Sequence, residues 1–221
     1  LRMDDTGSSQ SRDIDYVKKK FEKALELHET GNFDEAASAY QNLLETYPLN
    51  SLLLNSYGTL LYQQGNILDG PHIIKKSITL NSNTSIFYNR LGVIKRTQGD
   101  LDGACKMFKR ALFIEEQYEA NLNLCETYLE QRHPEAALAP GRRALALAPN
   151  AFLPHLRLAT ALRLVGKFNE ALAEVEEAKS LNPLAPDPYM ELTMSNIGAE
   201  KGEAALNAVV RGLILAPDRL D

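Results

Sequence analysis

The sequence predicts an all-α fold, an α-solenoid built from repeated helix–turn–helix pairs. Three observations support this prediction. Apolar residues recur at steps that place them on one face of a helix. The same landmark residues return at intervals of about 34 residues along the chain. Glycine or proline separates the apolar stretches, where each favours the end of a helix.

Residues 152–185 show how one such repeat is built. Its first helix is expected to end at Gly166, because glycine adopts the left-handed conformation without strain. Its second helix is expected to end before Pro183, because the residue that precedes a proline disfavours the helical region. The apolar stripes of the two helices are Leu156, Ala159, Leu162 and Val165, and then Ala171, Val175 and Ala178. A helix pair this thin cannot bury both of its faces alone, so it needs neighbours on either side.

Six repeats in this register are expected to fill residues 13–221 as one array with a continuous core. Residues 1–12 are polar and rich in Ser and Asp, and we expect them to be a disordered lead or the remnant of a tag. The repeats are expected at about 17–50, 51–84, 85–117, 118–151, 152–185 and 186–219.

Two repeats depart from the common pattern in their second helices. Gly70 and Pro71 stand where the second repeat would begin this helix, so we expect a late start with Asp69 as the cap. In the fourth repeat, Pro140 and Gly141 fall inside the helix. A proline there removes a backbone hydrogen bond and costs about 3 kcal/mol. We therefore expect the helix to bend or to open locally at Pro140.

The ladder of small residues, glycines and prolines resembles the tetratricopeptide repeat, and the resemblance covers residues 17–219. It implies a right-handed superhelix whose first helices line a concave groove. Within this family, the stretch FYNRLGVIKRTQGDLDGACKMFKRAL is similar to a repeat from the arrays of O-linked sugar transferases. The stretch LLNSYGTLLYQQGN resembles the six-repeat pilotins, bacterial lipoproteins that help secretin pores to assemble.

The resemblance places the ligand-binding residues of each repeat on its first helix, where they face the groove. The candidate peptide-binding residues are Asn55, Asn89, Arg90, Arg96, Asn123, Glu126, Arg157 and Arg163. One interpretation is a basic and polar strip that grips an extended acidic segment or a C-terminal carboxylate. The other is that Glu126 and Glu130 neutralise the arginines inside the protein. The sequence leaves both interpretations open.

Composition and motifs argue against several classes of function. The formal net charge of −5 argues against nucleic-acid binding, which calls for a basic surface. No apolar run approaches the length of a membrane span. The histidines lack metal-ligand spacing and no nucleotide-binding or nucleophile motif occurs, so we expect no metal, no cofactor and no catalytic residue. Cys105, Cys125 and His155 are interpreted as buried packing residues.

These observations predict a non-catalytic scaffold that binds a peptide or helix of another protein in the concave groove. The alternative is a targeting or substrate-recruitment module excised from a larger enzyme such as a glycosyltransferase. The outer side of the sixth repeat carries Val209, Val210 and Leu213 without a capping helix, which predicts self-association. Because no signal-peptide pattern opens the chain, a cytoplasmic location is favoured, with a periplasmic or membrane-peripheral one left open.

Overall fold

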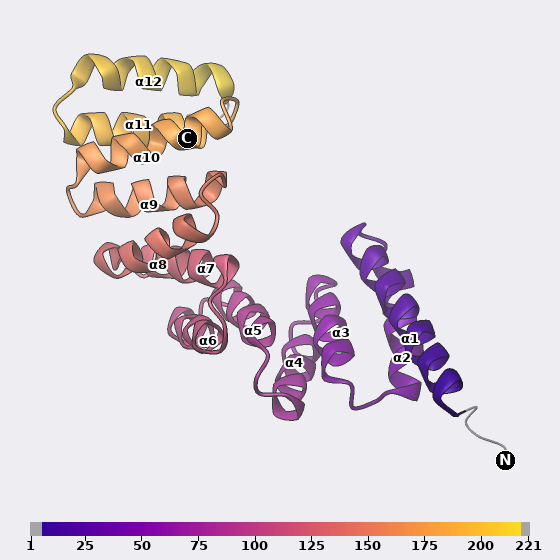
Figure 1. The fold of residues 1–221 in the computed structure, drawn as a ribbon. Coiled ribbons are helices and arrows are strands. Elements are labelled where there is room, and N and C mark those ends of the chain that lie inside the picture. Colours follow the sequence, from indigo (N-terminus) through magenta and orange to yellow (C-terminus); the bar gives the residue numbers. More distant parts are fainter. Residues whose placement is uncertain (1–5, 218–221) are drawn as a thin grey trace. The chain divides into compact units, whose positions relative to one another are not determined.

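The computed structural model describes residues 6–217, with side chains from Asp15 onward, and within that range it contains twelve α-helices and no strand (Figure 1). The helices are α1 (Thr6–Glu29), α2 (Phe33–Thr46), α3 (Ser51–Gln63), α4 (Asp69–Leu80), α5 (Ser85–Thr97), α6 (Leu101–Ile114), α7 (Tyr118–Glu130), α8 (Pro134–Leu147), α9 (Phe152–Leu164), α10 (Phe168–Leu181), α11 (Asp187–Gly198) and α12 (Gly202–Leu215). The predicted all-α fold class is confirmed, and consecutive helices correspond to the six expected repeats.

The chain forms two compact units, Leu1–Ile94 and Lys95–Asp221, which we call the N-terminal and C-terminal units. In the N-terminal unit α1 packs on α2, α2 on α3 and α3 on α4. In the C-terminal unit the helix pairs α7–α8, α9–α10 and α11–α12 stack in order through the contacts α8–α9 and α10–α11 (Figure 1). The first helices also touch their successors, α7 with α9 and α9 with α11. This stacking of neighbouring pairs is typical of an α-solenoid.

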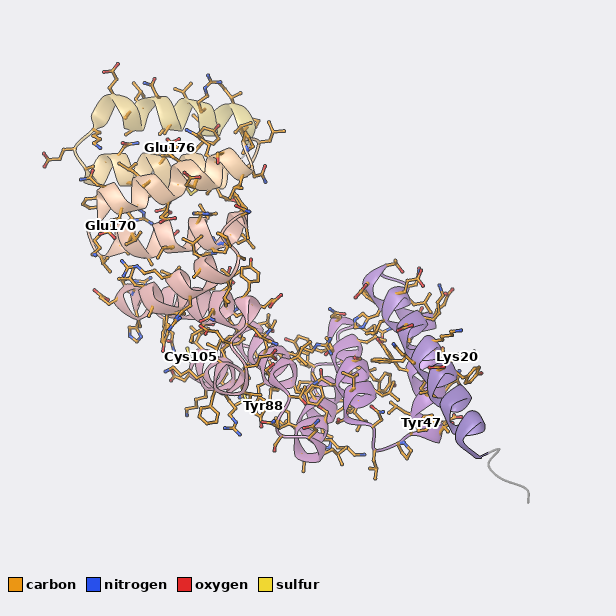
Figure 2. All side chains as sticks on the ribbon, viewed as in Figure 1. Lys20, Tyr47, Tyr88, Cys105, Glu170 and Glu176 are labelled. Carbon is orange, nitrogen blue, oxygen red and sulfur yellow. The ribbon has the colours of Figure 1, made fainter. Side chains whose placement is uncertain are left out.

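Small and apolar landmark residues fill the space between the helices of a pair. In the fifth repeat Ala159 of α9 and Ala171 and Val175 of α10 are fully buried. Their small side chains let the two helices approach closely, as the sequence pattern predicts. Charged side chains such as Glu170 and Glu176 of α10 are exposed to solvent (Figure 2).

A residue with positive φ makes the turn in each of the six repeats. Glycine takes this position in four of them, with φ of 80° at Gly31, 90° at Gly65, 79° at Gly99 and 79° at Gly166. Arg132 in the fourth repeat (φ 60°) and Glu200 in the sixth (φ 59°) adopt the same conformation with a side chain. In the sixth repeat the turn is therefore made by Glu200, while Gly202 begins α12.

The second repeat shows the predicted late start of its second helix, but Asp69 is not the cap. Helix α4 begins at Asp69 itself, and the residue before it, Leu68, gives no side-chain cap. Asn66 holds this end instead, because its Oδ1 accepts from the Asp69 N–H at 3.0 Å and its Nδ2 donates to Asp69 Oδ2 at 2.9 Å. Gly70 is required by packing, since a Cβ there would lie 2.8 Å from the carbonyl oxygen of Gly58.

The fourth repeat corrects the expectation of a local opening at Pro140. Helix α8 runs without interruption from Pro134 to Leu147 and buries both Pro140 and Gly141. A Cβ on Gly141 would lie 3.2 Å from Cys125 Sγ and 3.4 Å from Leu158 Cδ1. Close packing between α7 and α9 thus holds α8 together despite the hydrogen bond that proline removes.

The segment 1–12, predicted as a disordered lead, is only partly covered by the described residues. Residues 1–5 lie outside them, and residues 6–12 belong to α1, which begins at Thr6.

Candidate functional site

The predicted groove residues of the N-terminal unit meet at Arg90 of α5. Arg90 Nη1 donates to Asn55 Oδ1 at 2.7 Å and to Ser56 Oγ at 3.3 Å, both on α3. Asn55 is fully buried, and its Nδ2 donates to Ser77 Oγ of α4 at 3.1 Å. The position of the Arg90 guanidinium group is therefore fixed by buried partners. Asn89, which precedes Arg90 in the chain, is partly exposed.

Every partner of Arg90 in the described residues is electrically neutral. Asn55 and Ser56 carry no charge, and burial raises the pKa of the nearby Tyr40 to about 12, against the opposing effect of the Arg90 charge. Tyr40 therefore stays protonated near neutral pH and cannot serve as a counter-ion. Burial also lowers the pKa of the Arg90 guanidinium. Both of its hydrogen bonds use Nη1, and the described part of the chain provides no acceptor for Nε and Nη2.

A histidine and a glutamine extend this cluster toward α1. His28 Nδ1 lies 3.4 Å from the Tyr40 hydroxyl, and His28 Nε2 lies 2.5 Å from Gln63 Oε1 at the end of α3. These polar groups add hydrogen-bonding capacity without adding a carboxylate. The direct hydrogen-bond partners of Arg90 are thus neutral, while the Glu29 carboxylate also acts electrostatically on Tyr40.

In the C-terminal unit the arginines have carboxylate partners. Arg96 Nη1 donates to Glu126 Oε2 at 2.6 Å, and Arg157 Nε donates to Glu126 Oε1 at 2.9 Å. Arg96 Nε also lies 3.8 Å from Glu130 Oε1. Burial disfavours the ionised form of Glu126, but the hydrogen bonds from Arg157 and Arg96 outweigh it and lower the pKa of Glu126. Glu126 thereby links the first helices α5, α7 and α9.

A second group in the C-terminal unit neutralises Arg163. Its Nε donates to Glu191 Oε1 of α11, and Thr160 Oγ1 donates to Glu191 Oε2 at 3.1 Å. Only 8% of the Glu191 surface is exposed, so this ion pair is well shielded from solvent. The interpretation that Glu126 and Glu130 neutralise the arginines thus describes Arg96 and Arg157. Arg163 is paired with Glu191 instead, and Arg90 has no glutamate among its hydrogen-bond partners.

The sequence-predicted set is thus divided between the two units. Asn55, Asn89 and Arg90 belong to the N-terminal unit, and the other five belong to the C-terminal unit. All eight lie on first helices, α3, α5, α7 and α9. In the C-terminal unit, Glu126, Glu130, Arg157 and Thr160 line a shallow pocket together with Leu129. Asn123 is partly exposed on α7.

Two participating residues were not predicted. The sequence predicts Tyr40 only as a core residue of α2. The structure shows in addition that its hydroxyl lies within the electrostatic influence of Arg90. Glu191 could have been found, because it takes in α11 the position that Arg157 takes in α9. When one repeat position carries an arginine in one repeat and a glutamate in the next, an ion pair between first helices of neighbouring repeats is expected.

The cysteines and His155 are packing residues, as predicted. Cys125 is fully buried, and burial raises its thiol pKa to about 12. Cys105 is also buried, with a raised pKa for the same reason. His155 is held by Glu174 Oε2, 2.7 Å from its Nδ1, and by the carbonyl of Pro149, 2.9 Å from its Nε2. These environments disfavour reactive thiolates.

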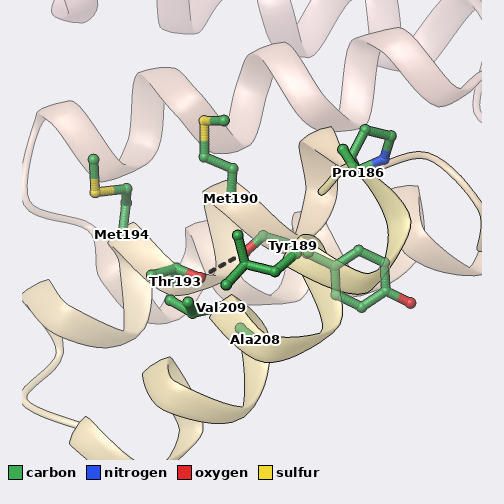
Figure 3. A pocket seen from close by; sticks show the side chains of 10 residues that line it. Pro186, Tyr189, Met190, Thr193, Met194, Ala208 and Val209 are labelled. Atoms are coloured by element: carbon green, nitrogen blue, oxygen red, sulfur yellow. Dashed lines mark hydrogen bonds between the residues drawn. The ribbon is translucent and has the colours of Figure 1, made fainter. Parts of the chain in front are cut away.

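An apolar pocket lies between α11 and α12 (Figure 3). It is lined by Pro186, Tyr189, Met190, Thr193, Met194, Ala208, Val209, Gly212, Leu213 and Ala216. Met190 and Met194 extend in the same direction from α11, and the Thr193 hydroxyl is bonded to the carbonyl of Tyr189 at 2.8 Å (Figure 3). The Tyr189 hydroxyl likewise donates to the carbonyl of Pro183 at 3.3 Å. Both lining hydroxyls are therefore bonded to the backbone, so the pocket suits an apolar ligand surface.

Two further searches of the described residues concern membranes and metals. Every helix in residues 6–217 is too short or too polar to span a bilayer. Within the same range, no three His, Cys, Asp or Glu side chains gather in a manner that would hold a metal ion.

Stacked helix pairs with a polar face on their first helices define a helical-repeat protein. The family model described as Tetratricopeptide repeat matches residues 21–69 and 89–152, which together make up half of the chain. The chain belongs to the tetratricopeptide repeat family.

Solved structures show the same fold at low sequence identity. PilW, described as a widely conserved type IV pilus biogenesis factor, is similar with a TM-score of 0.80 at 17% identity, over 93% of this chain and 96% of that one. Pseudomonas aeruginosa pilF is similar with a TM-score of 0.82 at 15% identity, over 92% of this chain and 93% of that one. YrrB, described as a TPR protein with an unusual peptide-binding site, is similar with a TM-score of 0.74 at 20% identity, over 83% of this chain and 95% of that one. No curated protein matches the sequence.

Proposed function

We propose that the chain is a non-catalytic scaffold that binds a segment of a partner protein on its first helices, with Arg90 as the anchor for a carboxylate. The observation that carries this proposal is the set of neutral partners around a partly buried guanidinium. Family membership supports the general role, since repeats of this kind present extended binding surfaces. The structurally similar YrrB is described as having a peptide-binding site.

A carboxylate is the ligand group that fits Arg90 best. The guanidinium is charged at all physiological pH values, and removing it from water without a counter-ion is costly. A carboxylate would supply both the missing charge and two acceptors for Nε and Nη2. Hydrogen bonds to charged groups contribute about 1.5–3 kcal/mol each. The anchor therefore selects an aspartate or glutamate side chain, or a chain end.

The other groove arginines are poorer anchors. Arg157 and Arg96 share Glu126, and Arg163 is paired with Glu191. An incoming carboxylate would have to displace an existing ion pair, and it would meet like charge from Glu126 or Glu191. The C-terminal unit is instead suited to neutral or mixed-charge contacts, with both signs of charge lining its pocket.

The test is capture of peptides from a random library by the wild-type protein and by two variants, Arg90→Gln and Arg157→Gln. We expect wild type and Arg157→Gln to recover the same peptides, enriched in a carboxylate at one position. We expect Arg90→Gln to lose this enrichment.

The matched pair of variants separates the two sites, because both remove one guanidinium from a first helix. Enrichment of acidic peptides that survives in Arg90→Gln and disappears in Arg157→Gln would place the anchor in the C-terminal unit. A library with no enriched peptide for wild type would contradict the proposal as a whole.

A further inference from the structure

Two positions of the first helices contact each other from one repeat to the next. Counted from the first residue of each repeat, the ninth residue of one first helix is hydrogen-bonded to the sixth residue of the following one in the C-terminal unit. Glu126 Oε1 of α7 accepts from Arg157 Nε of α9 at 2.9 Å. Thr160 Oγ1 of α9 donates to Glu191 Oε2 of α11 at 3.1 Å. The ninth residue is therefore a natural partner for the sixth residue of the next repeat.

The same pair of positions is filled differently in the N-terminal unit. Arg90 is the sixth residue of the third repeat, as Arg157 is of the fifth, but the ninth residue of the second repeat is Thr59. Thr59 carries no charge, and its hydroxyl donates to the carbonyl of Asn55 in its own helix at 2.8 Å. A threonine thus stands at the position from which Glu126 supplies a carboxylate to Arg157.

The hydrogen bonds of Arg90 leave one nitrogen for such a carboxylate. Arg90 uses Nη1 for its bonds to Asn55 and Ser56, whereas Arg157 bonds Glu126 through Nε. The described part of the chain provides no acceptor for Arg90 Nε. A carboxylate introduced by Thr59→Glu would therefore pair with Nε while Nη1 keeps its bond to Asn55, because the guanidinium group donates from several nitrogens at once.

We propose that Thr59 is the specificity-determining residue of the Arg90 site. Because Thr59 withholds the carboxylate that Glu126 gives to Arg157, Arg90 takes its carboxylate from a ligand. This inference rests on the proposed function, which assigns a ligand carboxylate to Arg90. It adds that one residue, one repeat earlier, decides whether a groove arginine is paired within the chain or selects an acidic ligand.

The experiment offers one random peptide library to the wild-type chain, to Thr59→Glu and to Thr59→Gln. Glutamine has the size and shape of glutamate without its charge, so Thr59→Gln is the matched control for crowding of the groove. We expect wild type and Thr59→Gln to recover the same acidic peptides. Thr59→Glu should show about tenfold less enrichment, because its carboxylate occupies Arg90 and repels a second one.

Urea unfolding without any peptide tests the pairing separately from ligand binding. Arg90→Gln is introduced into wild type, into Thr59→Glu and into Thr59→Gln. We expect Arg90→Gln to lower the urea midpoint more in Thr59→Glu than in the other two, because only there does it break an ion pair. Thr59 is partly exposed, so Thr59→Glu should fold as wild type by circular dichroism. Failure to fold would mean that the new carboxylate finds no partner, and would overturn the proposal.

The remaining outcomes separate this inference from the proposed function. An equal fall of the urea midpoint in all backgrounds would overturn the inference. Unchanged capture of acidic peptides by Thr59→Glu, or an equal loss of capture by Thr59→Gln, would also overturn it. A larger fall in Thr59→Glu together with no enriched peptide for wild type would support pairing by the ninth residue and would contradict Arg90 as the anchor.

Discussion

At the scale of single residues, the decisive feature is how each groove arginine is compensated. Arg96, Arg157 and Arg163 are paired with glutamates from neighbouring first helices. Arg90 is bonded only to Asn55 and Ser56 in the described residues. Side chains of the same type at equivalent repeat positions therefore have different surroundings, and we propose a structural role in the C-terminal unit and a ligand-binding role in the N-terminal unit.

The first prediction concerns the pH dependence of Glu126. Its pKa is lowered in the folded state, so its contribution to stability is present above the unfolded-state pKa of about 4.3 and is lost as the pH falls through the folded value. We expect Glu126→Gln to reduce the free energy of unfolding by roughly 1–3 kcal/mol at pH 7. Urea titrations at pH 7 and pH 3 should show this difference shrinking in acid. A constant difference would mean that the ionised carboxylate is not responsible.

A second prediction tests the stacking contact of Leu158. This side chain is 2% exposed and packs between α8 and α10. Leu158→Asp would bury a carboxylate without a partner, which costs several kcal/mol. Thermal unfolding should show a large fall in Tm, or no folded protein. A Tm within a degree of wild type would contradict the packing described.

At the scale of elements, the sequence predicts helices and turns well because their causes are local. Gly166 ends α9 where expected, and Pro183 follows the end of α10. The helix through Pro140 could not be predicted, because Cys125 and Leu158, which hold it, come from two other helices. The pairing of Glu126 with both Arg96 and Arg157 was one of two open interpretations, because it depends on side-chain conformations across three helices.

The turns offer a prediction at this scale. Glu200 makes the turn of the sixth repeat with φ of 59°, a conformation that costs about 1–2 kcal/mol with a side chain. Glycine removes this strain but costs about 0.5–1 kcal/mol in unfolded-state entropy. We therefore expect Glu200→Gly to stabilise the protein by about 0.5–1 kcal/mol. Glu203→Gly, in the first turn of α12, is the control and should not stabilise. A lower Tm for Glu200→Gly would show that the turn is not strained.

At the scale of the molecule, the two compact units differ in the charge balance of their first helices. In the N-terminal unit the Arg90 guanidinium is hydrogen-bonded to neutral side chains. The C-terminal unit holds arginine–glutamate ion pairs on its first helices and the apolar pocket between α11 and α12. Repeats with one fold thus provide chemically distinct surfaces.

The central claim, that Arg90 anchors a carboxylate, is tested most directly by a double-mutant cycle. Calorimetry measures the affinity of an enriched peptide and of the same peptide with its acidic residue changed to the amide, each against wild type and Arg90→Gln. We predict a coupling energy of about 1.5–3 kcal/mol. Either single change already removes the charge-assisted hydrogen bond, so the second change has no further interaction to remove. Independent effects of the two changes, with a coupling near zero, would show that the carboxylate binds elsewhere and would contradict the claim.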